Sequence, residues 1–224
     1  KTKLNQKKLL SSTNRTAAAT YTIPVVVHVI HNGEAIGTGG NISLAQINSQ
    51  IAVLNEDFKR LNTDASNTPA EFLPVAGNLD IEFILAKQDP AGLPTTGILR
   101  VNGNKSSWAM TDNSNLKALS YWPAEDYLNI WVTNLSGTLL GYAQFPPTDG
   151  LSGLGGIEGP SDRLTDGVVA DYTTFGSIAK GAFPSLVAPF NRGRTTTHEV
   201  GQFFGLLHIW GDASCGTDFV NDTP

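Results

Sequence analysis

The side chains best suited to catalysis lie close together in the sequence, within residues 195–208. Read as a helix of 3.6 residues per turn, the stretch puts His198 and Gln202 on one face, four residues apart. Gly205 permits the backbone to leave the helix and turn back, so His208 can return to the same place. Two side chains one turn apart and a third from beyond a glycine turn form a three-ligand set for zinc, with the fourth tetrahedral position left for water.

Glu199 directly follows the first of these candidate ligands. Its carboxylate is placed to take a proton from a water at the fourth position, so the chemistry that fits is hydrolysis with Glu199 as general base and later general acid. Gln202 is the unusual member, because its amide oxygen is a neutral donor whereas zinc sites are built from imidazole, thiolate and carboxylate. A His–Glu pair alone indicates little, but here Glu199, Gly205 and His208 all sit at the required offsets.

The whole stretch resembles the metzincin signature H-E-x-x-H-x-x-G-x-x-H, with Gln202 in place of the second histidine. The flanking sequence is similar to that of the pappalysin family of metzincins. That similarity is carried by residues 141–146 and 193–197 before the motif, and by residues 208–212, Cys215, Asp218 and residues 222–224 after it. The resemblance extends from about Ile23 to the last residue.

The resemblance implies a zinc-dependent endopeptidase that hydrolyses peptide bonds in a polypeptide substrate and is secreted. It implies zinc on His198, Gln202 and His208, with Glu199 as the catalytic residue. Because Gln202 is a poor zinc ligand, the contrasting hypothesis is a catalytically impaired pseudo-protease that acts as a peptide- or metal-binding module. Metal content and peptidase activity distinguish the two.

The end of the sequence suggests a second cation. Oxygen-bearing side chains recur at Asp218, Asn221, Asp222 and Thr223, and calcium prefers such ligands. The resemblance points to calcium near Asp218 and Thr223, while a solvated acidic turn is the alternative interpretation. Cys215, the single cysteine, is either a free buried thiol or one half of a disulfide, and the resemblance favours a partner further along the chain.

Metzincins carry a Met-turn beneath the metal, and the single methionine here is Met110, upstream of the motif. The expectation is therefore a catalytic domain over residues 21–224 that stops before the Met-turn, with the C-terminal subdomain largely absent. Residues 1–20 lack periodicity and are expected to form a flexible arm or the remnant of a pro-segment.

The length and net charge of the chain limit the number of domains and the kinds of partner that we expect. A chain of 224 residues suits one well-buried domain rather than two independent ones. A net charge of -5 argues against nucleic acid or an anionic membrane as a partner, and no apolar run approaches the roughly 20 residues of a membrane helix. The oligomeric state is left open.

The periodicity of apolar residues predicts the strands and helices that support this stretch. Residues 23–30 are a continuous β-branched run, which predicts a strand in the middle of a sheet, with His28 as a hydrogen-bonded core histidine rather than a metal ligand paired with His31. A capping box at Ser43 and apolar residues at spacings of three and four predict an amphipathic helix to about Arg60, with Leu44 in its apolar stripe. Further strands are expected over 81–85, 97–101, 128–132 and 167–171, and a short helix over 113–122.

These elements predict an α+β fold, a metzincin-like twisted mixed sheet with residues 43–60 as its backing helix and residues 196–205 as an active-site helix along the cleft. Thr195 to Thr197 are expected to cap that helix. The glycine-rich residues 137–159 should precede or form the cleft edge that holds an extended peptide, and the strand 167–171 is a candidate for that edge. Trp108, Trp122 and Trp131 are expected to pack in the core, because no basic patch accompanies them.

Overall fold

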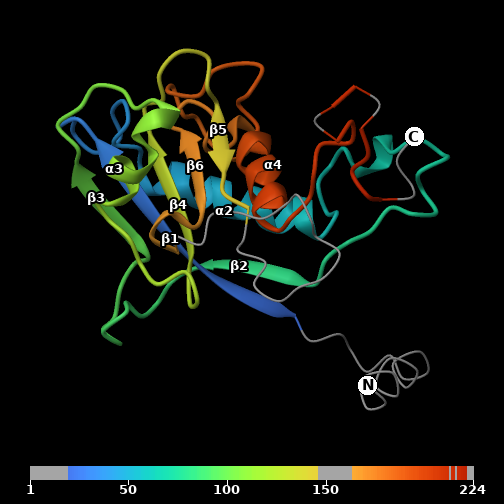
Figure 1. The fold of residues 1–224 in the computed structure, drawn as a ribbon, viewed down its shortest axis with the longest axis horizontal. Helices are drawn as coiled ribbons and strands as arrows, with labels where there is room; N and C mark the ends of the chain where they lie inside the picture. Colours follow the sequence, from blue (N-terminus) through green and yellow to red (C-terminus); the bar gives the residue numbers. More distant parts are fainter. Residues whose placement is uncertain (1–19, 146–162, 212, 215, 221–224) are drawn as a thin grey trace.

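The computed structural model describes residues 20–145, 163–211, 213, 214 and 216–220. It confirms the α+β class, with one six-stranded sheet and few helices (Figure 1). The strands are β1 (Tyr21–His31), β2 (Ile81–Leu85), β3 (Ile98–Asn102), β4 (Leu128–Thr133), β5 (Gly141–Ala143) and β6 (Val168–Asp171). The α-helices are α2 (Leu44–Phe58), α3 (Asn113–Lys117) and α4 (Arg194–Phe203), and the 3-10 helices are η2 (Ala65–Asn67), η3 (Met110–Asp112), η4 (Arg163–Thr165) and η5 (Ile178–Lys180).

The long strand β1 is the centre of the sheet, as its β-branched run predicts. On one side its first half pairs with β2 and its second half with β3, and its other side pairs with β4, all in parallel. β6 continues the sheet parallel to β4, and β5 closes this end as an antiparallel strand. The order is therefore β2-β1-β4-β6-β5, with β3 beside β1.

Both faces of the sheet are covered, which explains why β1 has no polar face. Val25, Val27 and Val29 join the core formed with α2 and α4, to which Leu54 and Val200 contribute. α2 crosses behind β4, β5 and β6 in Figure 1. On the opposite face a second cluster forms around Trp108 and Trp131, while Trp122 packs in a third, so these three tryptophans are core residues as predicted.

The backing helix begins where the sequence predicts, but its cap differs in detail. The hydroxyl of Ser43 accepts a hydrogen bond from the amide of Gln46 at 3.1 Å. The Gln46 side chain instead donates to the carbonyl oxygens of Tyr172 and Phe175, which ties α2 to the loop after β6. The prediction that Leu44 faces the core is wrong: it lies in the first turn and is 53% exposed.

The prediction that residues 167–171 form the sheet edge is also wrong. β6 pairs with β4 on one side and β5 on the other, and all four of its residues are buried. The apolar residues Val168, Val169 and Ala170 suit such a central position. Within the described residues, the strand at this end of the sheet is β5, which lies inside the predicted cleft-edge segment; residues 146–159 of that segment lie outside the described residues.

The predicted helix over 113–122 is shorter than expected, because α3 ends at Lys117. The carbonyl of Ser120 accepts a hydrogen bond from the Trp131 indole, and the Asn129 side chain pairs with the backbone of Trp122. The bond from the Trp122 amide uses a donor that a helix continuing to residue 122 would need.

His28 is a core histidine, as predicted. Its ring is fully buried and hydrogen-bonded to the Ser120 hydroxyl at 2.7 Å and to the Asn129 side-chain oxygen at 2.9 Å. Burial lowers the pKa of His28 to about 4, so the ring is neutral at physiological pH.

Candidate active site

The active-site helix α4 begins at a glycine and not at a threonine cap. Gly193 occupies the N-cap with φ of 75° and no side-chain hydrogen bond, so the prediction that Thr195 to Thr197 cap the helix is wrong. A Cβ at Gly193 would lie 2.9 Å from the side-chain oxygen of Gln50, whose amide nitrogen donates to the Gly193 carbonyl. The close approach of α2 therefore requires glycine here, and α2 sets the start of α4.

Asp57, at the end of α2, joins the two helices. Its carboxylate accepts a hydrogen bond from the Thr197 hydroxyl at 2.7 Å and forms an ion pair with Arg194 at 3.1 Å. Burial raises the pKa of Asp57, while the Thr197 bond and the Arg194 charge lower it. The first turn of α4, next to His198, is thus fixed to the backing helix.

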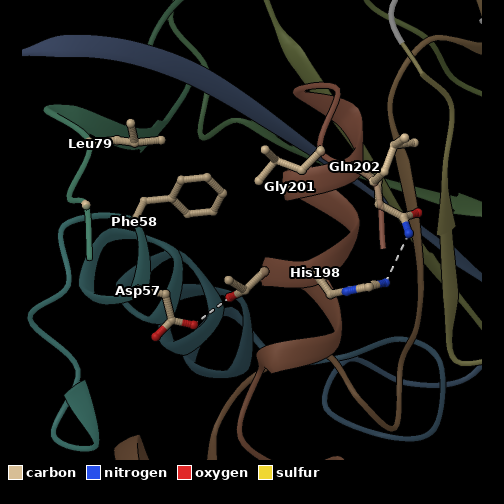
Figure 2. A pocket seen from close by; sticks show the side chains of 10 residues that line it. Asp57, Phe58, Leu79, His198, Gly201 and Gln202 are labelled. Atoms are coloured by element: carbon tan, nitrogen blue, oxygen red, sulfur yellow. Dashed lines mark hydrogen bonds between the residues drawn. The ribbon is translucent and has the colours of Figure 1, made fainter. Parts of the chain in front are cut away.

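The three predicted zinc ligands converge. The Nε2 atoms of His198 and His208 lie 3.1 Å apart, and the Gln202 side-chain nitrogen lies 3.1 Å from the first and 2.7 Å from the second. Gln202 is one turn from His198, and His208 returns because the chain leaves the helix at Gly205, where φ is 90°. Figure 2 shows His198 and Gln202 joined on one side of α4, with Asp57 and Phe58 on the other.

The triangle, with sides of 2.7 to 3.1 Å, is slightly smaller than the one that three ligands of a tetrahedral zinc ion form. Zinc–nitrogen bonds of about 2.0–2.1 Å in a tetrahedron place neighbouring donors about 3.4 Å apart. The nitrogen and oxygen of the Gln202 amide are exchanged by a simple flip, so the oxygen can take the place shown for the nitrogen. Burial and the neighbouring His208 lower the pKa of His198, which favours the neutral ring that a metal ligand requires. Among the described residues, no group of three His, Cys, Asp or Glu side chains could hold a metal, so a site here depends on Gln202.

An aromatic stack holds His208, the third predicted ligand, in place. The His208 ring lies between His198, at 5.0 Å between ring centroids, and Trp210, at 4.5 Å, with planes within 17° of parallel on both sides. Trp210 is 57% exposed, unlike the three core tryptophans. Its contact with His208 gives this tryptophan a role in orienting a candidate ligand.

Glu199 lies against the edge strand β5. It is 7% exposed, and burial raises its pKa to about 7 although the nearby His208 lowers it. A Cβ at Gly141, the first residue of β5, would lie 3.1 Å from Cγ and 3.3 Å from Oε1 of Glu199. Glycine at 141 therefore makes room for the carboxylate beneath the edge strand, and a carboxyl group with this pKa can exchange protons near neutral pH.

A cavity of about 350 Å³ opens beside His198 and Gln202, on the side of α4 that faces α2. Its walls include Phe58 and Leu79 (Figure 2). Leu207, after the glycine turn, also lines it. On the core side of α4, Val200 is fully buried and Phe203 packs against the core. Leu207 instead lines this cavity, while the Phe204 ring meets Phe58 edge-on at 5.9 Å between centroids.

The predicted calcium site is only partly within the described residues. The carboxylate of Asp218 accepts a hydrogen bond from the amide of Val220 at 3.1 Å. Thr223 and Cys215 lie outside the described residues, so calcium at Asp218 and Thr223 and the pairing of Cys215 stay predictions.

Solved structures identify the family. No model of a known protein family matches the chain. Mature mirolysin of Tannerella forsythia in complex with a cleaved peptide is 46% identical, with a TM-score of 0.78, over 92% of this chain and 72% of that one. The chain belongs to the pappalysin family of metzincin metalloproteases. A promirolysin variant from the same organism matches this pappalysin chain at 45% identity and a TM-score of 0.78, over 99% of this chain and 67% of that one.

More distant relatives of this pappalysin chain are named extracellular metalloproteases. An extracellular metalloprotease of Verticillium alfalfae is 30% identical over 98% of this chain, and the match covers 63% of that protein. One from Colletotrichum graminicola is 30% identical over 98% of this chain, and the match covers 64% of that protein. The pappalysin chain thus spans under two thirds of these relatives. None of its described helices is long and apolar enough to cross a membrane.

Two contributors to this pappalysin site were missed by sequence reasoning. Asp57 lies in the polar half of an amphipathic helix, and nothing local marks it as the acceptor for Thr197 and Arg194. Gly141 was noted only as part of a resembling segment, and its contact with Glu199 joins residues far apart in the sequence. The sequence offers one indication of the Asp57 contact: the Thr197 hydroxyl, just before the motif, can donate a hydrogen bond and so favours a polar neighbour.

Proposed function

We propose that the protein is a secreted, zinc-dependent endopeptidase whose metal is held by His198, Gln202 and His208. The observation that carries the proposal is the convergence of these three side chains within 3.1 Å of one another, directly beside the buried Glu199. The names of the relatives support a metalloprotease that acts outside the cell. Mirolysin bound to a cleaved peptide supports a polypeptide as substrate.

Zinc at this site would supply a Lewis acid that polarises the scissile carbonyl and makes water a stronger acid. Glu199 then takes the proton of the attacking water and gives it to the leaving amine. Its pKa of about 7 suits both transfers near neutral pH. The close approach of Gly141 limits the positions that the Glu199 carboxylate can take, and so helps to orient it towards the proposed cleft.

The edge strand β5 is proposed to hold the substrate. Its inner side is paired with β6, and a Cβ on its first residue, Gly141, would lie 3.3 Å from Oε1 of Glu199. An extended peptide can add to the outer side of β5 by main-chain hydrogen bonds, which bind any sequence in an extended form. Such a peptide would place its backbone next to Glu199.

Gln202 favours one alternative, a pseudo-protease that binds peptide or metal and does not cut. An amide oxygen carries no charge and is not among the usual zinc ligands, so affinity for the metal should be lower than with three histidines. The alternative and the protease differ in zinc affinity and in turnover.

The test combines Glu199→Ala and Gln202→His with the parent protein. Zinc content is measured by elemental analysis after incubation with excess zinc, and peptidase activity on a denatured protein substrate. We expect about one zinc per chain in the parent, tighter zinc binding in Gln202→His because an imidazole reaches the same position, and no cleavage by Glu199→Ala. Gln88→His, at an exposed position away from the site, is the matched control.

Each outcome separates the hypotheses. Parent protein that never holds zinc would refute the metal site, and Gln202→His that gains zinc and cleavage would identify Gln202 as a defect in an impaired protease. Zinc bound by all forms without cleavage by any would support the binding module. Equal cleavage by the parent and Gln202→His would establish Gln202 as a competent ligand.

A further inference from the structure

An asparagine followed by a glycine occurs at residues 32–33 and again at residues 102–103. In such a pair the backbone nitrogen of the glycine can attack the side-chain carbonyl carbon of the asparagine, because glycine has no Cβ to shield its nitrogen. The attack closes a succinimide ring and releases ammonia, and water then opens the ring to aspartate or isoaspartate. Both pairs have this chemistry, so a difference between them must come from their surroundings in the fold.

The first pair lies in a turn directly after β1, where Asn32 and Gly33 are both exposed. The backbone amide of Gly33 donates a hydrogen bond to Nδ1 of His31 at 3.0 Å. A ring nitrogen can accept such a bond only when it carries no proton. A free base therefore lies at the amide whose proton must be removed before the Gly33 nitrogen can attack.

The main chain of this turn is held, whereas the side chain of Asn32 can move. The Asn32 amide donates to the Glu34 carboxylate at 2.6 Å, and the Glu34 carbonyl accepts a bond from the Asn41 side chain at 2.7 Å. In the part of the chain that the structure describes, no residue forms a hydrogen bond with the side-chain amide of Asn32. That amide can therefore rotate towards the Gly33 nitrogen while the bond to His31 is kept.

The second pair has different surroundings. Asn102 is the last residue of β3 and pairs with His31 of β1. The amide of Gly103 donates to the carbonyl oxygen of His31 at 2.8 Å, so its partner is a ladder oxygen and not a base. The side-chain oxygen of Asn102 accepts a bond from the Asn104 amide at 3.0 Å. Both the nucleophile and the side chain are thus restrained at this pair.

We propose that Asn32 is a site of spontaneous modification at which His31 acts as the base for ring closure. Nδ1 of His31 takes the amide proton of Gly33 as the nitrogen forms a bond to Cγ of Asn32. The bond from Cγ to Nδ2 breaks, and the proton leaves with the ammonia. Water then adds to one of the two ring carbonyls, which gives aspartate or an isoaspartate whose main chain is longer by a methylene. No metal and no peptidase activity take part, so the inference is independent of the proposed function.

The test follows both pairs in the same sample of parent protein, folded in neutral buffer and unfolded in urea. Peptide mapping by mass spectrometry measures the loss of asparagine and the formation of isoaspartate with time. In the folded protein we expect Asn32 to react about tenfold or more faster than Asn102, since a positioned general base commonly contributes about 10²–10⁴-fold. In urea the two rates should be similar, because the bond between Gly33 and His31 is lost.

His31→Phe keeps an aromatic ring and removes the base. In the folded variant we expect the rate at Asn32 to fall to about a tenth of the parent rate, while the rate at Asn102 stays unchanged. Asn102 is therefore the matched control within the same molecule. In urea the variant and the parent should react alike at both pairs.

Equal rates at the two pairs in the folded parent would overturn the proposal, and so would aspartate without isoaspartate at residue 32, because direct hydrolysis gives aspartate alone. A folded His31→Phe protein that modifies Asn32 at the parent rate would exclude His31 as the base. If this variant does not fold, the parent decides. A rate at Asn32 that rises on unfolding refutes a positioned base, and a rate that falls on unfolding supports it.

Discussion

Gly141→Ala is expected to displace the carboxylate of Glu199, the proposed catalytic group, and to leave every proposed zinc ligand in place. The added Cβ would lie 3.0 Å from the carbonyl oxygen of Val169, 3.1 Å from Cγ of Glu199 and 3.3 Å from its Oε1. The Val169 carbonyl belongs to the neighbouring strand and is held in the sheet. The Glu199 side chain is the part that can yield, and ordinary contact requires it to move by a few tenths of an ångström.

That movement should reduce the rate more than it reduces stability. A misplacement of 1 Å in a catalytic group can lower the rate by about 100-fold, so half of that distance should lower kcat by about tenfold. The crowding costs about 1 kcal/mol of folding stability, which the loss of glycine's freedom in the unfolded chain partly offsets. We therefore expect a melting temperature close to that of the parent, together with a lower kcat.

The assay measures kcat on a fluorogenic peptide, zinc content and the melting temperature of Gly141→Ala. Gly40→Ala is the control, since a Cβ there would meet its nearest atom, the Ile30 carbonyl oxygen, at an ordinary 3.9 Å. Zinc content should equal that of the parent in both variants. A Gly141→Ala protein that cleaves at the parent rate would refute the positioning of Glu199 by the edge strand, and loss of zinc would show that the damage extends beyond the carboxylate.

Asp57→Asn should destabilise the protein by about 1–3 kcal/mol in denaturant unfolding, because the buried charge that binds Thr197 and Arg194 is lost. The control Asp64→Asn removes a more exposed ion pair with Arg194 and should cost about 1 kcal/mol or less. Equal effects of the two variants would show that Asp57 does not fix α4 to α2. Lys117 is fully buried, and burial lowers its pKa from 10.5 to about 7, although Asp166 acts in the opposite direction. Between these pH values the unfolded chain binds a proton that the folded protein does not, so stability should rise with pH by at most about 1.4 kcal/mol per unit and fall as pH drops towards 7. Lys117→Met should flatten this dependence in urea unfolding at pH 7–9, and an unchanged slope would count against the assignment. Calcium should raise the melting temperature if the acidic turn near the chain end is a binding site; a midpoint unmoved by calcium would favour a solvated turn.

The convergence of the three proposed metal ligands was predictable because their geometry is encoded locally. His198 and Gln202 are one helical turn apart, and Gly205 is the residue that can adopt the positive φ needed to bring His208 back. The central place of β1 was likewise readable, because a strand buried on both faces cannot carry alternating polar residues. The backing helix followed from its apolar spacing and from Ser43.

Tertiary structure alone decided which strand is the edge and what surrounds Glu199. The run at β6 and the short strand β5 carry no local signal of their neighbours, because strand order depends on pairing between distant segments. The same is true of the contact between Gly141 and Glu199 and of the bonds from Asp57 to α4. The raised pKa of Glu199 arises from the desolvation that these long-range contacts impose, which is a property of the packed protein and not of any short stretch of its sequence.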